Sequence, residues 1–267
     1  MTSSFLETIN RDGTARRVLE KCDYGCDYGA GDWSPDGHRL AYVDANCPIE
    51  CGFGTKIATV RADGSHRKVL FRPGQDCCVW SPAWSPDGRR IAFIKSRYFY
   101  GPGRGNVFIV HRDGTHLERI NTKHRAEYTL DWSSRNRLVV GARLHKQNDL
   151  FIMGPHGGYR RRLTNNHATE GQVDWAPGGR RLVFVRGPEV GDLLSAGEIW
   201  KIGAMGQRPS LVTAGRSPAW APNGSLIAFV VGNHDIHTVR PSRKHDTLLS
   251  RPPHTGQITE LDWRPRL

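Results

Sequence analysis

A tryptophan motif recurs six times along the 267 residues and constrains the fold more than any other feature. The best copies read Trp-Ser-Pro-Asp-Gly, and a short apolar run such as Ile-Ala-Phe-Ile follows them. The six tryptophans are Trp33, Trp84, Trp132, Trp175, Trp220 and Trp263. Successive copies lie 51, 48, 43, 45 and 43 residues apart. A chain with this period is expected to fold as a series of similar units rather than around one irregular core.

Each repeat carries two hairpin signals. Pro-Asp-Gly and Ala-Asp-Gly are turn sequences, because proline fixes φ and glycine accepts a positive φ. The first turn follows the tryptophan, as at 35–37 and 86–88, and the second lies midway to the next tryptophan, as at 62–64. Apolar, β-branched and aromatic residues flank both turns, as half-buried strands require. Helical periodicity is nowhere sustained, so each repeat is predicted to be a four-stranded antiparallel sheet.

Six such sheets predict an all-β fold, a six-bladed β-propeller. One sheet cannot bury both of its faces, but sheets stacked around an axis can bury them against each other. The repeat length is close to the roughly 40–45 residues of a propeller blade. We predict a single domain over residues 1–267. Its expected blades are residues 32–71, 83–120, 131–164, 174–213, 219–250, and a closing blade made of 258–267 with 5–20.

The closing blade is expected to be shared between the two ends of the chain, which removes the open edges of the ring. The C-terminal segment would supply its innermost strand, and the N-terminal hairpin would supply its third and fourth strands. The second strand is lacking, and it would lie upstream of Met1. We therefore expect the protein to begin earlier than this sequence does. A three-stranded closing blade is the alternative.

These motifs resemble the repeats of the TolB-like (WD40-like, PD40) propeller family, and the resemblance covers nearly the whole chain. It implies a propeller with a central channel that is used for protein–protein contact, typically outside the bacterial cytoplasm. The same repeats accompany serine peptidases, but this chain has no Gly-x-Ser-x-Gly motif and no room for a peptidase domain. We expect a monomeric, non-enzymatic binding or scaffold propeller without a cofactor, in the periplasm or outside the cell. A cytoplasmic location is the alternative.

The alternative function is a hydrolase or lactonase with a metal at the mouth of the channel. The long loops of all blades share one rim, and five histidines fall on it: His124, His145, His167, His234 and His254. Glu127 and Glu170 each follow a histidine by three residues, at matching places in neighbouring blades. Such pairs can bind a cation or a polar ligand, and solvated loop residues are the other interpretation. Tightly bound metal in the purified protein would favour the enzyme.

Aspartate directly precedes four of the six tryptophans, at Asp32, Asp131, Asp174 and Asp262. On an innermost strand these carboxylates either ring the channel or cap local turns. Asp131 and Asp174 join the histidines and glutamates of the long-loop rim as candidates for binding a ligand or a partner.

All six cysteines fall on the long-loop rim of the first blades: Cys22, Cys26, Cys47, Cys51, Cys77 and Cys78. Their even number and clustering favour disulfides and an oxidising compartment. A thiolate metal site is a weaker alternative, because the two Cys-x3-Cys pairs have no histidine at partner spacing. Free thiols are the third. Bridges between loops of neighbouring blades would stabilise more than bridges within a pair, because they close longer loops.

The chain is basic, with 38 lysines and arginines against 26 acidic residues and a formal charge of +12. Many of the basic residues lie in or beside the tight turns of the opposite rim: Arg16, Arg17, Arg39, Arg67, Lys68, Arg89, Arg90, Arg160, Arg161, Arg162, Arg180, Arg181, Arg243 and Lys244. Guanidinium groups bind phosphate and carboxylate in a bidentate manner, so this rim is a candidate surface for an anionic partner. Solvated turn residues are the other interpretation. No aromatic residues alternate with these turns, so specific nucleic-acid binding is not predicted. No apolar run approaches the roughly 18 residues of a transmembrane helix.

Overall fold

The computed structural model describes residues 4–22, 28–44, 55–74, 78–96, 105–120, 126–144, 147–157, 160–187, 197–242, 246–251, 258 and 260–265. Every regular element in these residues is a β-strand, as predicted. All of the paired strands run antiparallel to their neighbours in the sheets. Across the same ranges no helix is long and apolar enough to cross a membrane.

The first three sheets have four strands each, in chain order. The first sheet contains β3 (Tyr28–Trp33), β4 (Arg39–Asp44), β5 (Lys56–Arg61) and β6 (Lys68–Phe71). The second contains β7 (Cys78–Trp84), β8 (Arg90–Ser96), β9 (Asn106–His111) and β10 (Glu118–Arg119). The third contains β11 (Ala126–Trp132), β12 (Leu138–Leu144), β13 (Gln147–Met153) and β14 (Arg160–Arg162).

A seven-stranded sheet follows, in which two four-stranded units share one long strand. Its strands are β15 (Thr169–Trp175), β16 (Arg181–Gly187), β17 (Gly197–Gly203), β18 (Ser210–Trp220), β19 (Ile227–Val231), β20 (Asp235–Val239) and β21 (Asp246–Ser250). The first half of β18 pairs with β17 and its second half pairs with β19. We number these five four-stranded units blades one to five. A separate hairpin is formed by β1 (Ser4–Thr8) and β2 (Arg17–Cys22).

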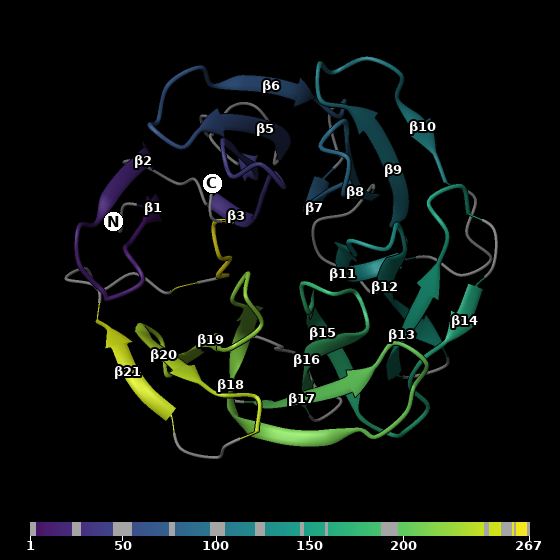
Figure 1. Cartoon of the computed structure of the whole chain (residues 1–267). Coiled ribbons are helices and arrows are strands. Elements are labelled where there is room, and N and C mark those ends of the chain that lie inside the picture. Colours follow the sequence, from purple (N-terminus) through teal and green to yellow (C-terminus); the bar gives the residue numbers. More distant parts are fainter. Residues whose placement is uncertain are drawn as a thin grey trace.

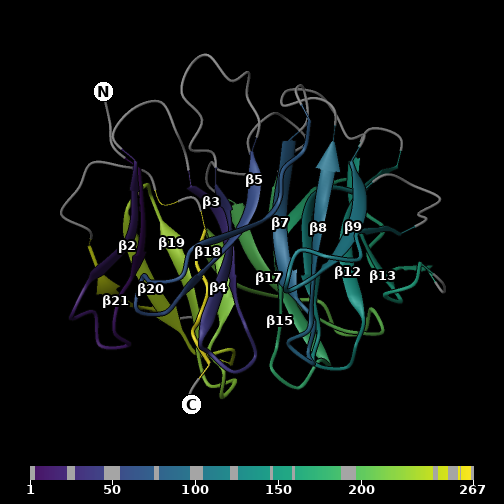
Figure 2. The ribbon, with the colours of Figure 1, turned by 90° about the horizontal axis from the view of Figure 1, so that it is seen from above.

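The blades are arranged around a common centre, with the strand that ends in the tryptophan innermost (Figure 1). Strands β2, β6, β10, β14 and β21 lie on the outside. Seen from the side, the tight turns within the hairpins gather at the end of the molecule where the C-terminus is drawn (Figure 2). We call this end the tight-turn rim and the opposite end the long-loop rim.

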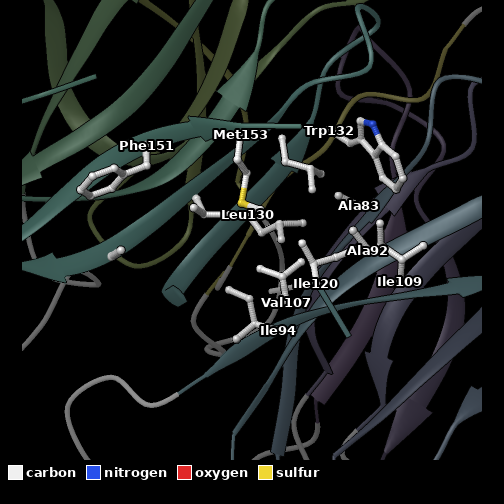
Figure 3. Close-up of a cluster of buried hydrophobic side chains, with 13 residues drawn as sticks. Ala83, Ala92, Ile94, Val107, Ile109, Ile120, Leu130, Trp132, Phe151 and Met153 are labelled. Atoms are coloured by element: carbon white, nitrogen blue, oxygen red, sulfur yellow. The ribbon is translucent and has the colours of Figure 1, made fainter. Parts of the chain in front are cut away.

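Each tryptophan packs between its own blade and the preceding one. Trp84 shares an apolar cluster with Ile57 and Leu70 of blade one. Trp132 lies beside Ala83 of blade two in the cluster drawn in Figure 3. The exposed fractions are 6% for Trp33, 3% for Trp84, 6% for Trp132, 6% for Trp175 and 7% for Trp220. The predicted packing of tryptophan between blades is confirmed.

The innermost strand of each of the five blades is bulged, since its register with the second strand shifts within the six residues that precede the tryptophan. Ser81, Gln172 and Ser217 occupy matching places in these bulges, and their φ angles are 49°, 47° and 50°. A bulge bends the strand and re-aims the side chains that follow it. Here it leads into the residue before the tryptophan, which lines the centre of the molecule in blades one, three and four.

The two ends of the chain meet between blades five and one. Leu19 of β2 packs against Trp33 of blade one, and on the other side the guanidinium of Arg16 donates to Ser250 Oγ at 2.7 Å. Residues 258 and 260–265 run near the centre without regular strand pairing, unlike the innermost strand predicted for this segment. In the other blades the innermost strand pairs with the second strand, and among the described residues no second strand lies beside this segment.

Candidate functional site

Acidic side chains line a pocket on the axis of the molecule. Its described lining includes no lysine or arginine, and its carboxyl groups belong to Asp32, Asp131, Asp174, Asp262 and Glu260. The pocket encloses about 420 Å³, counting the open solvent at its mouth. The chain as a whole is strongly basic, yet its axis is acidic.

Each of the four aspartates accepts a hydrogen bond from a backbone amide of the next blade around the ring. The sequence left open whether these side chains ring the channel or cap turns, and the structure places them in the pocket with their bonds reaching across to the neighbouring tryptophan. The bonds run from Trp175 N to Asp131 Oδ2 at 2.7 Å, from Trp220 N to Asp174 Oδ2 at 2.5 Å, from Trp33 N to Asp262 Oδ2 at 2.8 Å, and from Trp84 N to Asp32 Oδ2.

Blades two and five have alanine at this position, Ala83 and Ala219. The tryptophan amides that follow them around the ring therefore have no carboxylate on the preceding blade. Each donates instead to the aspartate directly before it, Trp132 N to Asp131 Oδ1 at 2.6 Å and Trp263 N to Asp262 Oδ1 at 2.7 Å. In the described residues Asp131 and Asp262 thus accept two backbone amides each, whereas Asp32 and Asp174 accept one.

Desolvation raises the pKa of every carboxyl in the pocket, although Asp32, Asp131 and Asp174 are half-buried and Glu260 and Asp262 are exposed to the channel. Desolvation, and then the charges of neighbouring carboxylates, raise the pKa of Asp32 and of Asp174 well above the usual range. Desolvation raises the pKa of Asp131, although the amides of Trp175 and Trp132 oppose it. Desolvation also raises the pKa of Asp262 to about 7 and that of Glu260 to about 8. Asp131 and Asp174, and likewise Asp32 and Asp262, lie close enough to influence each other's pKa.

The predicted rim histidines and glutamates are only partly described. His124, His145 and the side chain of Glu127 lie outside the described residues. His167 is exposed and His234 is half-buried. The assignment of these residues to a binding rim stays a prediction.

Glu170 is the predicted rim residue whose surroundings are clearest. It is only 1% exposed, and the guanidinium of Arg186 contacts its carboxylate at 2.8 Å. The amide of Asn166 donates to the same carboxylate at 2.6 Å. Arg186 in turn lies over the ring of Trp200 at 4.3 Å. Glu170 therefore serves as an internal ion-pair partner within blade four.

A metal centre was the basis of the alternative enzymatic interpretation. Over the described ranges, no group of three or more histidine, cysteine, aspartate or glutamate side chains is arranged to hold a metal ion. Four residues were proposed to hold the metal. The structure describes His167 and Glu170, whereas His124 and the side chain of Glu127 lie outside the described residues.

One cysteine side chain is described. Cys78 lies in β7 opposite Ser96 and is 2% exposed. The side chains of Cys22, Cys26, Cys47, Cys51 and Cys77 lie outside the described residues. The disulfide prediction therefore stays a prediction.

Several predicted rim cations connect neighbouring blades. They donate to backbone carbonyls of the next tight turn: Arg17 to Asp63 O at 2.5 Å, Lys68 to Asp113 O at 2.8 Å, and Arg161 to Ala204 O at 2.7 Å. Three more form ion pairs: Arg16 with Glu7, Arg67 with Asp44, and Arg162 with Asp149. Arg160 stacks on Phe151 at 4.3 Å, and burial lowers its pKa to about 10. These side chains have structural roles, while Arg243 and Lys244 lie outside the described residues.

A second set of arginines on this rim is exposed: Arg135, Arg180, Arg181 and Arg208. We call these four the basic sector. They lie in the tight turns of blades three and four, where residues 133–137, 154–157, 176–181 and 203–208 contain no acidic residue. The corresponding turns of blades one and two contain Asp36, Asp63, Asp87 and Asp113.

Backbone contacts bring the turns of the basic sector together. Arg135 Nε donates to Gly178 O at 2.9 Å, which ties blade three to blade four. Within blade four, Ala204 N donates to Arg180 O at 2.8 Å. Sequence reasoning missed Arg135 and Arg208, although their place in the turns was a usable signal. It also missed Glu260, which stands three residues before its tryptophan, as Gln172 does in blade four.

The comparisons with known sequences point to one propeller family. The family described as TolB beta propeller domain (PD40) matches residues 38–265. The Tol-Pal system protein TolB of Thioalkalivibrio sulfidiphilus is 34% identical over 83 residues, which are 31% of this chain and 17% of that protein. The protein of the same name from Alcanivorax borkumensis is 32% identical over 72 residues, 27% of this chain and 15% of that protein. The matches thus cover less than a fifth of the length of these relatives.

Solved structures give the same architecture. TolB from Acinetobacter baumannii matches with a TM-score of 0.79 at 16% identity, covering 98% of this chain and 63% of that one. An oligogalacturonate lyase in complex with manganese matches with a TM-score of 0.62 at 11% identity, covering 94% and 72% of the two chains. At these identities the likeness establishes the fold alone, and the same fold occurs in TolB and in a lyase.

Proposed function

Since this chain belongs to the TolB beta propeller domain family, we propose that it is a non-enzymatic binding propeller whose basic sector holds an acidic segment of a protein partner. The names of the two curated relatives, Tol-Pal system proteins, support a role among interacting proteins. The proposal places the protein in the periplasm or outside the cell, where the predicted disulfides would form.

The observation that carries the proposal is the unbalanced charge of the basic sector. Its four guanidinium groups are exposed, and no acidic residue in the same turns neutralises them. Planar guanidinium groups bind carboxylates through two parallel hydrogen bonds. The turns that carry them are held by hydrogen bonds between blades, such as that of Arg161 to Ala204 O. These turns would therefore lose little conformational entropy on binding. An acidic segment lying across blades three and four would fit this surface.

We also propose that the ring has six blades and that the terminal segments together make the sixth. In two complete blades the glycine of the second tight turn packs on the outer strand of the preceding blade. A Cβ on Gly114 would lie 3.2 Å from Leu70 O, and one on Gly206 would lie 3.2 Å from Leu163 O. A glycine that packs in this way on the outer strand of the preceding blade therefore indicates that its hairpin occupies the outer position of a blade in the ring.

The hairpin β1–β2 makes the same contact on both of its sides. A Cβ on Gly13 would lie 2.3 Å from Leu249 O of blade five. A Cβ on Gly64 of blade one would lie 3.7 Å from Leu19 O of the hairpin. These contacts support a closing blade between blades five and one, which would make the rim a continuous and rigid binding surface.

The test of the binding proposal reverses the charge of the basic sector in the full chain. The variant Arg180→Glu, Arg181→Glu, Arg208→Glu is compared with wild type for binding of a labelled oligoglutamate peptide at low salt. Exposed ionic contacts are each worth about 0.5 kcal/mol, so the triple reversal should weaken binding by about tenfold or more. Raising the salt concentration should weaken wild-type binding in the same direction.

The matched control reverses Arg61, Arg89 and Arg112, which are also exposed on the same rim. Each of these lies near an aspartate, Asp63, Asp87 or Asp36, so it should contribute little to binding. Equal weakening by the control would show that only the net charge matters, and it would contradict the basic sector. Binding to anionic lipid vesicles but not to the peptide would contradict the protein partner.

A further inference from the structure

The residues that precede the tryptophans repeat after three blades. Blade two reads Pro82-Ala83-Trp84, and blade five reads Pro218-Ala219-Trp220. Blade three reads Leu130-Asp131-Trp132, and the terminal segment reads Leu261-Asp262-Trp263. Blades one and four both carry aspartate before the tryptophan. The centre of the molecule therefore consists of two similar halves, which begin at blade one and at blade four.

The two boundaries between these halves carry the same arrangement of side chains. At one boundary Asp131 of blade three and Asp174 of blade four line the same pocket, and Asp131 Oδ2 accepts the amide of Trp175, the residue after Asp174. At the other boundary Asp262 of the terminal segment is placed in the same way beside Asp32 of blade one, since Asp262 Oδ2 accepts the amide of Trp33. Two ionised carboxylates have only acceptor atoms and cannot hydrogen-bond to each other. One proton held by a pair turns the repulsion of its two carboxylates into a hydrogen bond.

The backbone amides decide which carboxyl of each pair carries the proton. Asp131 and Asp262 each accept two tryptophan amides, with donor–acceptor distances between 2.6 and 2.8 Å. Asp174 and Asp32 each accept one. Hydrogen bonds from amides favour the ionised form, so the carboxyl with two amides is the better anion. The proton then sits on Asp174 and on Asp32, whose second oxygen can donate it to the partner.

The described lining of the pocket offers no positive charge to replace these protons. The lining of the pocket contributes one more carboxyl, that of Glu260, and neither lysine nor arginine. The elements that bear on the pairs are β3, β7, β11, β15, the second half of β18 and residues 260–262, and the charged groups that they place in the pocket lining are the five carboxyls. The buried guanidinium of Arg216 in β18 is outside this lining, and it donates to Gly232 O and Ile258 O. Ionising all five would gather like charges in a partly desolvated space, where their repulsion is strong.

We propose that the two carboxyl pairs, Asp131 with Asp174 and Asp32 with Asp262, are proton-dependent locks that hold the two halves of the ring together. With its proton, each pair is a hydrogen bond across a boundary between the halves. Without it, each pair becomes two carboxylates that repel each other across that boundary. The locks are closed at acidic and neutral pH and weaken in alkaline solution.

The direction of the pH effect follows from the shifts in pKa. An unfolded aspartate titrates near its ordinary pKa of about 3.9, whereas Asp262 in the folded chain has a pKa of about 7 and the pKa values of Asp32 and Asp174 are also raised well above the ordinary value. Between these values the folded state binds more protons than the unfolded state, so stability falls as the pH rises. The stability from the locks is fully present below the unfolded pKa and is lost as the pH rises through the folded values.

The experiment measures the unfolding temperature of the full chain between about pH 5 and pH 9 for wild type and two double variants. Asp32→Asn with Asp174→Asn replaces the two protonated carboxyls by amides, which donate the same hydrogen bond without needing a proton. Asp131→Asn with Asp262→Asn changes the two anions instead. All three proteins share the same histidines and surface acids, and Asp32 and Asp174 are not among the charges that raise the pKa of Glu260, so the comparison of the first variant with wild type reports on the locks.

The wild type should lose several degrees of unfolding temperature across this range, and Asp32→Asn with Asp174→Asn should lose less than half as much. Asp131→Asn with Asp262→Asn should be less stable than wild type at neutral pH, because two backbone amides at each site then bond to a neutral amide oxygen in place of a carboxylate. If the first variant falls as steeply as wild type, or if wild type does not respond to pH, the locks do not exist. Should a double variant fail to fold, the single substitutions Asp174→Asn and Asp131→Asn make the same comparison at one boundary.

Discussion

Two neighbouring blade junctions solve the same structural problem with different chemistry. Between blades two and three, and again between blades three and four, a tryptophan is inserted and is 6% exposed, as Trp132 and as Trp175. At the first junction blade two offers Ala83, and the tryptophan lies over an apolar cluster that includes Ile109. At the second junction blade three offers Asp131, which accepts the backbone amide of Trp175.

The second junction has another polar contact between blades three and four. Thr129 Oγ1 accepts the backbone amide of Val173 at 3.0 Å, in the bulge just before the tryptophan. The apolar packing of the tryptophan ring and the hydrogen bond of its backbone amide therefore vary independently between the junctions. Apolar packing of the tryptophan is common to both junctions, whereas the acceptor for its amide comes from the preceding blade in one case and from the blade itself in the other. Only the junctions with carboxylates on both sides can respond to pH.

The largest expected effect comes from removing the tryptophan side chain, which both junctions have in common. Trp132→Ala and Trp175→Ala should each cost about 3–5 kcal/mol of unfolding free energy, because both leave a cavity of indole size between blades. Chemical denaturation of the two variants should give losses that agree within about 1 kcal/mol, since the polar link does not replace packing. A loss below about 1 kcal/mol at either position would show that this tryptophan does not hold the blades together.

The next effect comes from exchanging the chemistry of the two junctions. Asp131→Ala removes the acceptor of two backbone amides and should cost about 2 kcal/mol, less than the tryptophan variants because channel water can bond to the amides. Ala83→Asp adds a carboxyl where the amide of Trp132 already has a partner, so it should cost about 1 kcal/mol at neutral pH. Equilibrium unfolding checks both. A stabilising Ala83→Asp would mean that the apolar junction lacks an acceptor, contrary to this account.

The smallest effect compares the proposed closing junction with an open turn. Gly13 and Gly224 both have positive φ, 84° and 68°, so alanine strains either turn by about 1 kcal/mol. A Cβ at Gly13 also meets Leu249 O, whereas Gly224 has nothing within 4 Å. Gly13→Ala should therefore lower stability by about 1–3 kcal/mol more than Gly224→Ala. Equal losses in thermal unfolding would place the hairpin away from blade five.

The repeat made much of the fold predictable. The tryptophan spacing and the Asp-Gly turns indicated four-stranded antiparallel sheets, and the burial of Trp33 and its counterparts followed from their fixed place in each sheet. The sequence also placed the aspartates on the innermost strands. These features depend on local pattern and on a period that every blade repeats.

Contacts between blades were harder to predict, because they depend on register across chain segments about 40 residues apart. Glu170 is an ion-pair partner of Arg186, and only the pairing of β15 with β16 brings them together. Arg161 and Lys68 were predicted as rim cations, but each reaches a carbonyl on the next blade. The sharing of a proton by two aspartates from different blades leaves no mark in the local sequence.

The proton-dependent locks can be tested most directly by nuclear magnetic resonance of the full chain with carbon-13 in its aspartate carboxyl groups. The carbon shifts would be followed with pH in wild type, Asp32→Asn and Asp174→Asn. We expect each pair to keep one proton through neutral pH, and each variant to lose one high-pH titration step. If all four channel aspartates instead release their protons near the ordinary pKa of about 3.9, the carboxyl pairs are not proton-dependent locks.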